Sequence, residues 1–388
     1  MIVRQFLHWV RNAPAGERAE ATGALARAFL YSELSADDRA AAEGAMLMLL
    51  DDSCPLVRRA LADALAASPS APAAVVYALA GDQPQIAAPV LALSPLFVDA
   101  DLVDAAATGC SAVQAAIASR ATLPRSVAAA IAEVGSAEAC LVLLENGSAD
   151  IAPFSIDRIV ERYGHLAAIR EPLLVREDIS PATRLTLISK LSATLAGFVA
   201  GREWIEADHA LRVAREACER VTIALAAETP DGEIRPLIRH LRESGQLTAG
   251  LILRALLSGN VVLFEEALAE LADMPVERVS GLVNGSGFAG LRALFDRAGL
   301  PASTYPALRE AIEAMREGGF NSEPGGAARL KRRMIERVLT RCEDEEFGEL
   351  APLVTLLHRF ATEAAREEAR LFCDGLVADD YAAQSIAA

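Results

Sequence analysis

The chain has 388 residues, of which 53% are hydrophobic and only 5% aromatic, and it carries a net charge of −16 at pH 7. This length fits two or three domains or one long repeat array. An acidic surface repels phosphate backbones and disfavours nucleic acid as a partner, and no apolar run is long enough to cross a bilayer. Alanine and leucine dominate and both favour helices, so the sequence predicts an all-α protein. The lack of a long apolar run predicts that it has no membrane contact.

The N-terminal stretch and the cysteines indicate the compartment. MIVRQFLHWVRNAP is short and amphipathic, and it lacks the apolar core and the cleavage site of a signal peptide. The six cysteines are far apart and none belongs to a CxxC pair, a pattern typical of free thiols in a reducing environment. We therefore expect a cytoplasmic protein.

The stretch DDSCPLVRRALADAL (51–65) opens a pattern that recurs through the N-terminal half. Apolar anchors recur every 27 to 29 residues, and each has an apolar partner four residues later on the same helix face. The pairs are Val57 and Leu61, Ile86 and Val90, Val113 and Ile117, Cys140 and Leu144, and Ile169 and Leu173. Ser, Asp or Gly, which start helices, stands four residues before all anchors but the last.

Further helical segments lie between these anchored helices, at 40–50, 71–80, 125–134 and 155–163. Each unit of about 28 residues is therefore predicted to be a helix, a short turn and a second helix. One such pair cannot cover its own apolar faces, so neighbouring pairs must stack. Residues 1–180 are predicted to form this array.

The opening unit resembles the HEAT repeat, whose second helix begins with Asp, a short turn, Pro and then Val-Arg. Here these residues are Asp52, Pro55, Val57 and Arg58. In the next unit Ala87 replaces the arginine, so we do not expect a continuous Asp–Arg ladder. The resemblance implies a HEAT-like α-solenoid, an α-α superhelix of stacked antiparallel helix pairs.

Several longer segments, at 86–106, 114–131, 143–151 and 243–283, are similar to an uncharacterised, mainly alphaproteobacterial family, domain of unknown function 2336. The resemblance implies HEAT-like helices in a bacterial protein. It supplies no catalytic motif and therefore no activity.

The rest of the chain is predicted to be helical as well. Longer helices continue the array over 181–316, with one expected at 203–228, and a Gly-, Ser- and Pro-rich stretch makes 317–327 a linker. Residues 328–388 are predicted to form a C-terminal helical hairpin of two helices, at 328–342 and about 346–374. An isolated hairpin is marginal, so it either folds back on the array as a cap or forms a homodimer with a second chain.

No catalytic, cofactor or metal site is predicted. GSGFAG (285–290) matches the dinucleotide pattern GxGxxG, but a helix is expected before it where that fold needs a strand. The five histidines are scattered and have no further ligands at metal-binding spacing. Three arginines are candidates for partner binding: Arg58, and Arg120 and Arg176, which stand two repeats apart. Each of the last two could instead pair with its own loop.

Two functions fit this organisation. The first is a non-enzymatic scaffold or adaptor that binds a protein or peptide on the concave face of the array. The alternative is a HEAT-like nucleic-acid-binding or DNA-repair protein resembling the HEAT-like glycosylases, which needs a basic groove. Residues 51–150 hold four arginines against eleven acidic residues, which favours the scaffold.

Overall fold

The computed structural model describes residues 8–10, 12–285, 287–318, 332, 334–340 and 351–386. Over these residues the secondary structure is helical, apart from one isolated bridge between Leu123 and Ala149. The all-α prediction is therefore confirmed. The chain divides into two compact units, Met1–Thr183 and Arg184–Ala388, and each is described by itself. Among the helices described, none combines the length and apolar character that crossing a bilayer requires.

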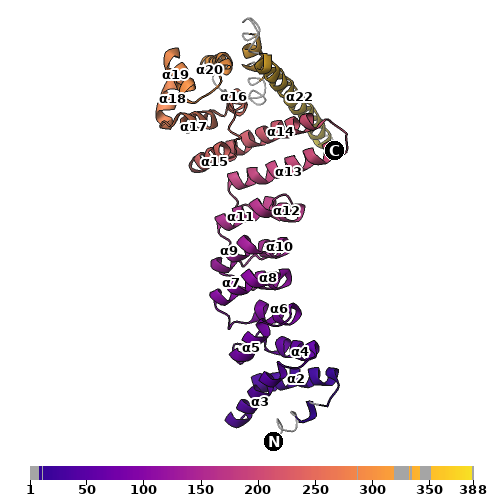
Figure 1. Ribbon diagram of the computed structural model, residues 1–388. Helices are drawn as coiled ribbons and strands as arrows, with labels where there is room; N and C mark the ends of the chain where they lie inside the picture. The colour runs from indigo at the N-terminus through magenta and orange to yellow at the C-terminus, as the bar shows by residue number, and fades with distance from the viewer. Residues whose placement is uncertain are drawn as a thin grey trace. The chain divides into compact units, whose positions relative to one another are not determined.

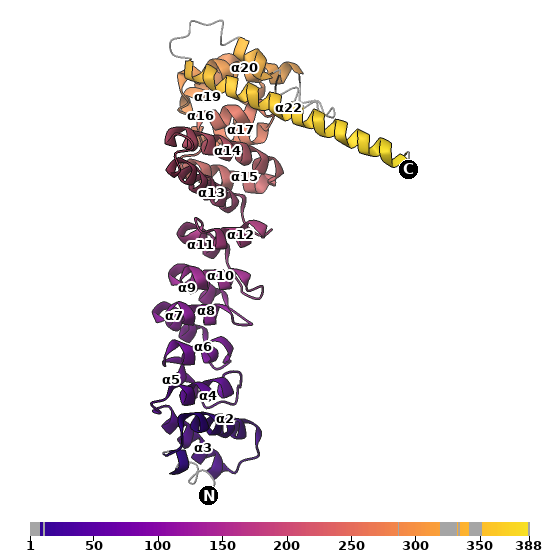
Figure 2. The same cartoon turned by 90° about the vertical axis from the view of Figure 1, so that its right-hand side faces the viewer.

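Unit 1 is an α-solenoid in which helices alternate between two columns (Figure 1; Figure 2). Its helices are α2 (Ala15–Tyr31), α3 (Ala36–Leu49), α4 (Pro55–Leu65), α5 (Ala73–Ala80), α6 (Pro84–Leu93), α7 (Asp99–Thr108), α8 (Ser111–Ala118), α9 (Arg125–Val134), α10 (Ala137–Glu145), α11 (Pro153–Tyr163) and α12 (Ala167–Val175). We call α4, α6, α8, α10 and α12 the even column, and α5, α7, α9 and α11 the odd column. Each even helix packs on the next even helix, and α7, α9 and α11 pack in the same way. The predicted period of about 28 residues corresponds to the distance along the chain from one even helix to the next.

The anchored helices are the even column, and their predicted inward faces are buried. All ten predicted anchor and partner side chains lie in the core, with Val113 the most exposed at 8%. These side chains are mostly aliphatic, and burying each contributes about 1.5–3 kcal/mol relative to leaving it in water. Stacking of neighbouring pairs therefore supplies the core that one pair lacks.

The predicted starts of the even helices are only partly correct. Ser136 caps α10 as predicted, because its hydroxyl accepts a hydrogen bond from the N–H of the third residue of that helix. At α4 and α6 the N-cap positions are Cys54 and Gln83, one residue later than predicted, and neither side chain forms a cap hydrogen bond. Pro55 and Pro84 begin these helices, and proline at the first position lacks one of the N–H groups that have no partner within the helix.

Ion pairs join successive units at the N-terminal end of the array. Arg18 of α2 forms two hydrogen bonds of 2.9 Å with Asp52, which lies in the turn before α4. Arg58 of α4 binds Asp82, in the turn before α6, at 2.5 and 3.0 Å. The hydrogen bonds from the two arginines lower the pKa of both aspartates. Each arginine thus ties its helix to the start of the next even helix.

Gln114 makes the equivalent connection farther along. It follows anchor Val113 as Arg58 follows anchor Val57, and its side chain is only 6% exposed. Its Oε1 accepts a hydrogen bond from the Ser136 N–H before α10, and its Nε2 donates to the Ala106 carbonyl in the last turn of α7, both at 2.9 Å. The Asp–Arg ladder does end, as predicted, but an amide takes its place.

Unit 2 contains longer helices. They are α14 (Ala207–Glu228), α15 (Asp231–Glu243), α16 (Ala249–Leu257), α17 (Val261–Ala272), α18 (Val276–Asn284), α19 (Phe288–Arg297), the short 3-10 helix η1 (Ala302–Thr304), α20 (Tyr305–Gly318) and α22 (Ala351–Ile386), while α13 (Pro181–Gly201) crosses the division between the units. The helix predicted at 203–228 starts later, at Ala207. The reason is Glu203, whose φ of 57° is left-handed and separates α13 from α14.

The predicted C-terminal helices are found where they are described. The predicted linker spans 317–327, and from residue 319 on it lies outside the described residues. In the first predicted helix, residues 332 and 334–340 are described, and they are helical. α22 extends beyond the predicted end at 374, and its Leu357 and Phe360 are buried as predicted. Arg359 of α22 binds Glu216 of α14 at 2.8 Å, so α22 folds back on unit 2. The homodimer stays a prediction.

Candidate functional site

All three arginines predicted to bind a partner form hydrogen bonds with other residues of unit 1. Arg58 forms the ion pair with Asp82 described above, and its Nη1 also donates to the Asp52 carbonyl at 2.5 Å. Its side chain is only 12% exposed. Arg58 is therefore a connection between repeats, and any contact with a partner stays a prediction.

Arg120 binds backbone carbonyls of the preceding even helix. Its Nη1 and Nη2 donate to the carbonyls of Leu91 and Ser94 at 2.5 and 2.8 Å, at the C-terminal end of α6. Cations are favourable there because the last carbonyls of a helix lack partners within it. Burial lowers the pKa of the Arg120 guanidinium.

Arg176 pairs with its own loop, one of the two alternatives that the sequence left open. Its Nε and Nη2 bind the two carboxylate oxygens of Asp178 at 2.8 and 2.6 Å. Arg120 and Arg176 follow α8 and α12, with α10 between those helices, and they do not meet in one site. The two arginines follow equivalent helices of the repeat, but their hydrogen-bond partners differ.

The even column presents an uncharged surface at its centre. The sequences of α6 and α8, PQIAAPVLAL and SAVQAAIA, contain no charged residue. Their outward side chains are small and mostly apolar, including the half-buried Ala88, Pro89, Ala115 and Ala116. We call the outward surface of α6 and α8 the alanine face. By contrast, the neighbouring α7 of the odd column carries three aspartates.

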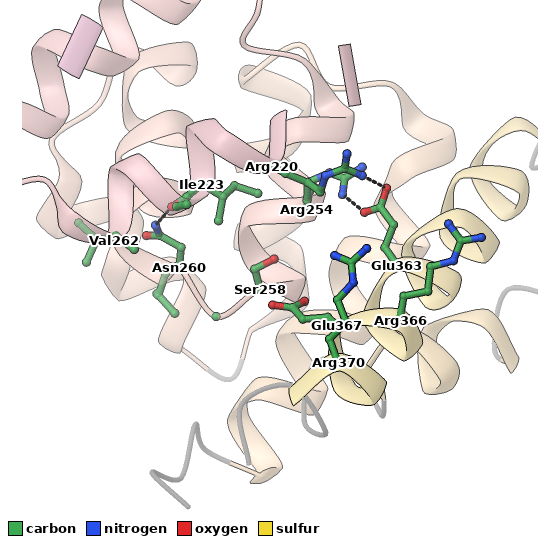
Figure 3. Close-up of a pocket in the computed structure, with 14 residues that line it drawn as sticks. Arg220, Ile223, Arg254, Ser258, Asn260, Val262, Glu363, Arg366, Glu367 and Arg370 are labelled. Atoms are coloured by element: carbon green, nitrogen blue, oxygen red, sulfur yellow. Dashed lines mark hydrogen bonds and ion pairs between the residues drawn. The ribbon is translucent and has the colours of Figure 1, made fainter. Parts of the chain in front are cut away.

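Unit 2 contains a pocket of about 900 Å³ between α14, the turn that joins α16 to α17, and α22. Figure 3 shows Glu363, Arg366, Glu367 and Arg370 along α22 on one side, and Ser258, Asn260 and Val262 on the other. Arg220 and Arg254 also line it. The pocket therefore gathers four arginines and two glutamates.

Glu363 is held by two of these arginines. Arg220 donates from Nη1 to Glu363 Oε1 at 2.8 Å, and Arg254 Nη1 binds Oε2 (Figure 3). Arg254 is 5% exposed, binds Glu219 through Nε at 3.2 Å, and stacks 4.0 Å from the ring centre of Phe360. Burial raises the pKa of Glu219. This cluster fixes α22 against α14 and α16.

Arg366 and Arg370 differ from the buried pair. Both side chains are exposed, and neither forms a hydrogen bond or an ion pair with any residue that the structure describes. They stand four residues apart on α22, so they lie on the same face of that helix. Their guanidinium groups are available to a ligand.

The other motifs from the sequence do not form a site. GSGFAG follows helix α18 rather than a strand, and its glycines include Gly285, the C-cap of α18, and Gly287, the N-cap of α19. Within the described ranges, no group of three or more His, Cys, Asp or Glu side chains is placed to hold a metal ion.

Comparison with known proteins identifies the family. The model of an uncharacterised protein family conserved in bacteria, DUF2336, matches residues 86–347. The chain belongs to this family. No curated protein and no solved structure matches it. The DUF2336 segment contains the alanine face apart from Pro84 and Gln85, and it contains the α14, α16 and α17 walls of the pocket, whereas α22 lies beyond it.

The sequence did not predict the pocket. It predicted α22 and the apolar face of that helix, and Arg366 and Arg370 could be seen as an i, i+4 pair on its polar face. The pocket is made of segments as distant as Arg220 and Arg370. No local pattern links such segments, so only the tertiary structure reveals that these charges meet.

Proposed function

We propose that the chain is a non-enzymatic scaffold that binds a protein segment on the alanine face of unit 1. The observation that carries this proposal is the uncharged surface of α6 and α8 in an otherwise strongly acidic protein. Charged residues are depleted at the centres of protein interfaces, because burying an unpaired charge is costly. Small side chains also let a partner's backbone approach closely.

The charge around this face indicates the kind of partner. On its α10 side the alanine face is flanked by Glu138 and Glu145, which are both exposed, and on its α4 side by the ion pair of Arg59 and Asp63. A partner segment with an apolar centre and basic ends would complement this arrangement and be attracted by the net charge of −16. The described cysteines are free thiols, which supports a reducing compartment such as the cytoplasm.

The proposal is tested with a charge placed on the face. Ala116→Glu in α8 should abolish capture of the partner by the tagged full-length chain, while Ala107→Glu, on the exposed side of α7, should leave capture intact. Circular dichroism checks that both variants fold. Equal capture by the two variants, or no captured protein at all, would refute the proposal.

The nucleic-acid alternative is tested with the same protein. A gel shift with duplex DNA at low salt should show no complex. Tight binding that weakens steeply with added salt would favour the alternative instead.

A further inference from the structure

We propose that the pocket between α14, the α16–α17 turn and α22 binds a small ligand that carries a phosphate or diphosphate group. This site is separate from the alanine face and does not depend on the scaffold function. Its volume of about 900 Å³ falls within the range of about 300–1,000 Å³ typical of small-molecule sites.

The charge of the lining favours an anion. Four arginines and two glutamates line the pocket, in a chain whose net charge is −16. Glu363 neutralises part of the charge on Arg220 and Arg254, and in doing so it shows that an oxyanion fits between these two guanidinium groups. Arg366 and Arg370 are the two lining arginines outside this ion-pair cluster, and Glu367 is the one other charged side chain of the lining.

The geometry of these two arginines suits phosphate. Guanidinium groups bind phosphate through paired hydrogen bonds, and arginine keeps its charge at every physiological pH. Since Arg366 and Arg370 are neighbours on one helix face, they can hold one phosphate together or two linked phosphates separately.

A second structural element reinforces the site. The N-terminus of α17 lies at the pocket, where Asn260 caps the helix by accepting a hydrogen bond from the Leu263 N–H at 3.0 Å, and Val261 and Val262 line the wall. The positive end of the helix dipole therefore adds to the charge of the arginines.

Beyond Arg220, the α14 wall of the pocket is apolar. Ile223, Ala224 and Ala227 of α14 contribute no hydrogen-bonding side chain to the pocket. A purely inorganic ion would leave this wall unused. The lining therefore fits an amphiphilic ligand, with its phosphate at α22 and an organic group against α14.

Isothermal titration calorimetry of the full-length protein at low salt tests the site with pyrophosphate, ATP and sulfate. We expect binding of pyrophosphate or ATP and weaker binding of sulfate. ATP binding more tightly than pyrophosphate would show that the apolar wall contributes, and equal affinity would show recognition through the phosphates alone. Both results support the site.

The matched variants are Arg366→Gln with Arg370→Gln, and Arg239→Gln on the exposed surface of α15 as the control. The double variant should weaken pyrophosphate or ATP binding by about tenfold or more, and the control should not. The proposal is overturned if neither phosphate compound binds at millimolar concentration, if sulfate binds as tightly, or if the double variant binds like the wild type.

Discussion

Gln114→Leu is the sharpest test of how unit 1 is held together. Gln114 is buried, and its amide connects α7, α8 and the start of α10 through two hydrogen bonds of 2.9 Å. Leucine is close to glutamine in size and more apolar. If burial of apolar surface alone decided stability, the variant would be as stable as the wild type or more so.

The structure predicts the opposite. The substitution leaves the buried Ala106 carbonyl and the half-buried Ser136 N–H without their partner, and losing the partner of such a group costs about 1–3 kcal/mol. Ala106 is fully buried, so water cannot replace the amide there. The more apolar leucine side chain offsets about 1–2 kcal/mol. We expect a net loss of about 2 kcal/mol.

Two measurements on the full-length protein check this value. Urea unfolding followed by circular dichroism should show a lower midpoint for Gln114→Leu. Because repeat arrays open locally, hydrogen exchange should also speed up in α7, α8 and α10 before it does in α4. The control is Gln85→Leu, the same change at an exposed position in α6, which should stay within about 0.5 kcal/mol of the wild type.

One outcome would refute the reasoning. If Gln114→Leu unfolds at the same urea concentration as the control, and exchange in the three helices is unchanged, then the bridging amide contributes nothing. The connection between repeats would then rest on apolar packing alone.

Three further predictions follow from the ion pairs and thiols. The pKa of Asp82 is lowered by its hydrogen bonds with Arg58, so the stability it contributes is present above about pH 4 and is lost as the pH falls through the folded-state value; urea midpoints should therefore fall less between pH 5 and pH 3 in Asp82→Asn than in the wild type. Burial raises the pKa of Cys140 to about 11, so iodoacetamide at pH 8 should label the exposed Cys110 and leave Cys140 unmodified, as mass spectrometry of peptides would show. Arg254→Met leaves the carboxylates of Glu219 and Glu363 without their buried partner, and the free energy of unfolding should fall by about 3–5 kcal/mol. This loss should appear as faster hydrogen exchange in α22, and unchanged exchange there would contradict the role of the cluster.

The repeat was predictable because its signal is local. Val57 and Leu61 lie on one face of one helix, and the same spacing returns in each unit, so helix periodicity alone gives the register and the buried side chains. The N-caps of α4 and α6 lie one residue later than predicted. A capping side chain and a proline in the first turn both indicate that a helix begins, so the sequence pattern does not fix the first residue.

The contacts across units were not predictable in the same way. Gln114 looks like a polar residue on a helix surface until its partners Ala106 and Ser136 are known. Likewise, nothing in the sequence near Arg254 indicates Glu363, which is 109 residues away. Both side chains are decided by tertiary packing, which local patterns do not encode.

The connections of unit 1 also bear on how such an array changes in length. Arg18, Arg58 and Gln114 each reach forward to the turn that begins the next even helix, and none reaches farther. A duplicate of the unit that holds Asp52 and Arg58 would bring one acceptor and one donor with it, so each existing ion pair would have an equivalent partner. Duplication of that unit would therefore keep the connections intact, whereas deletion of the unit that contains Asp82 would leave the Arg58 guanidinium without its carboxylate.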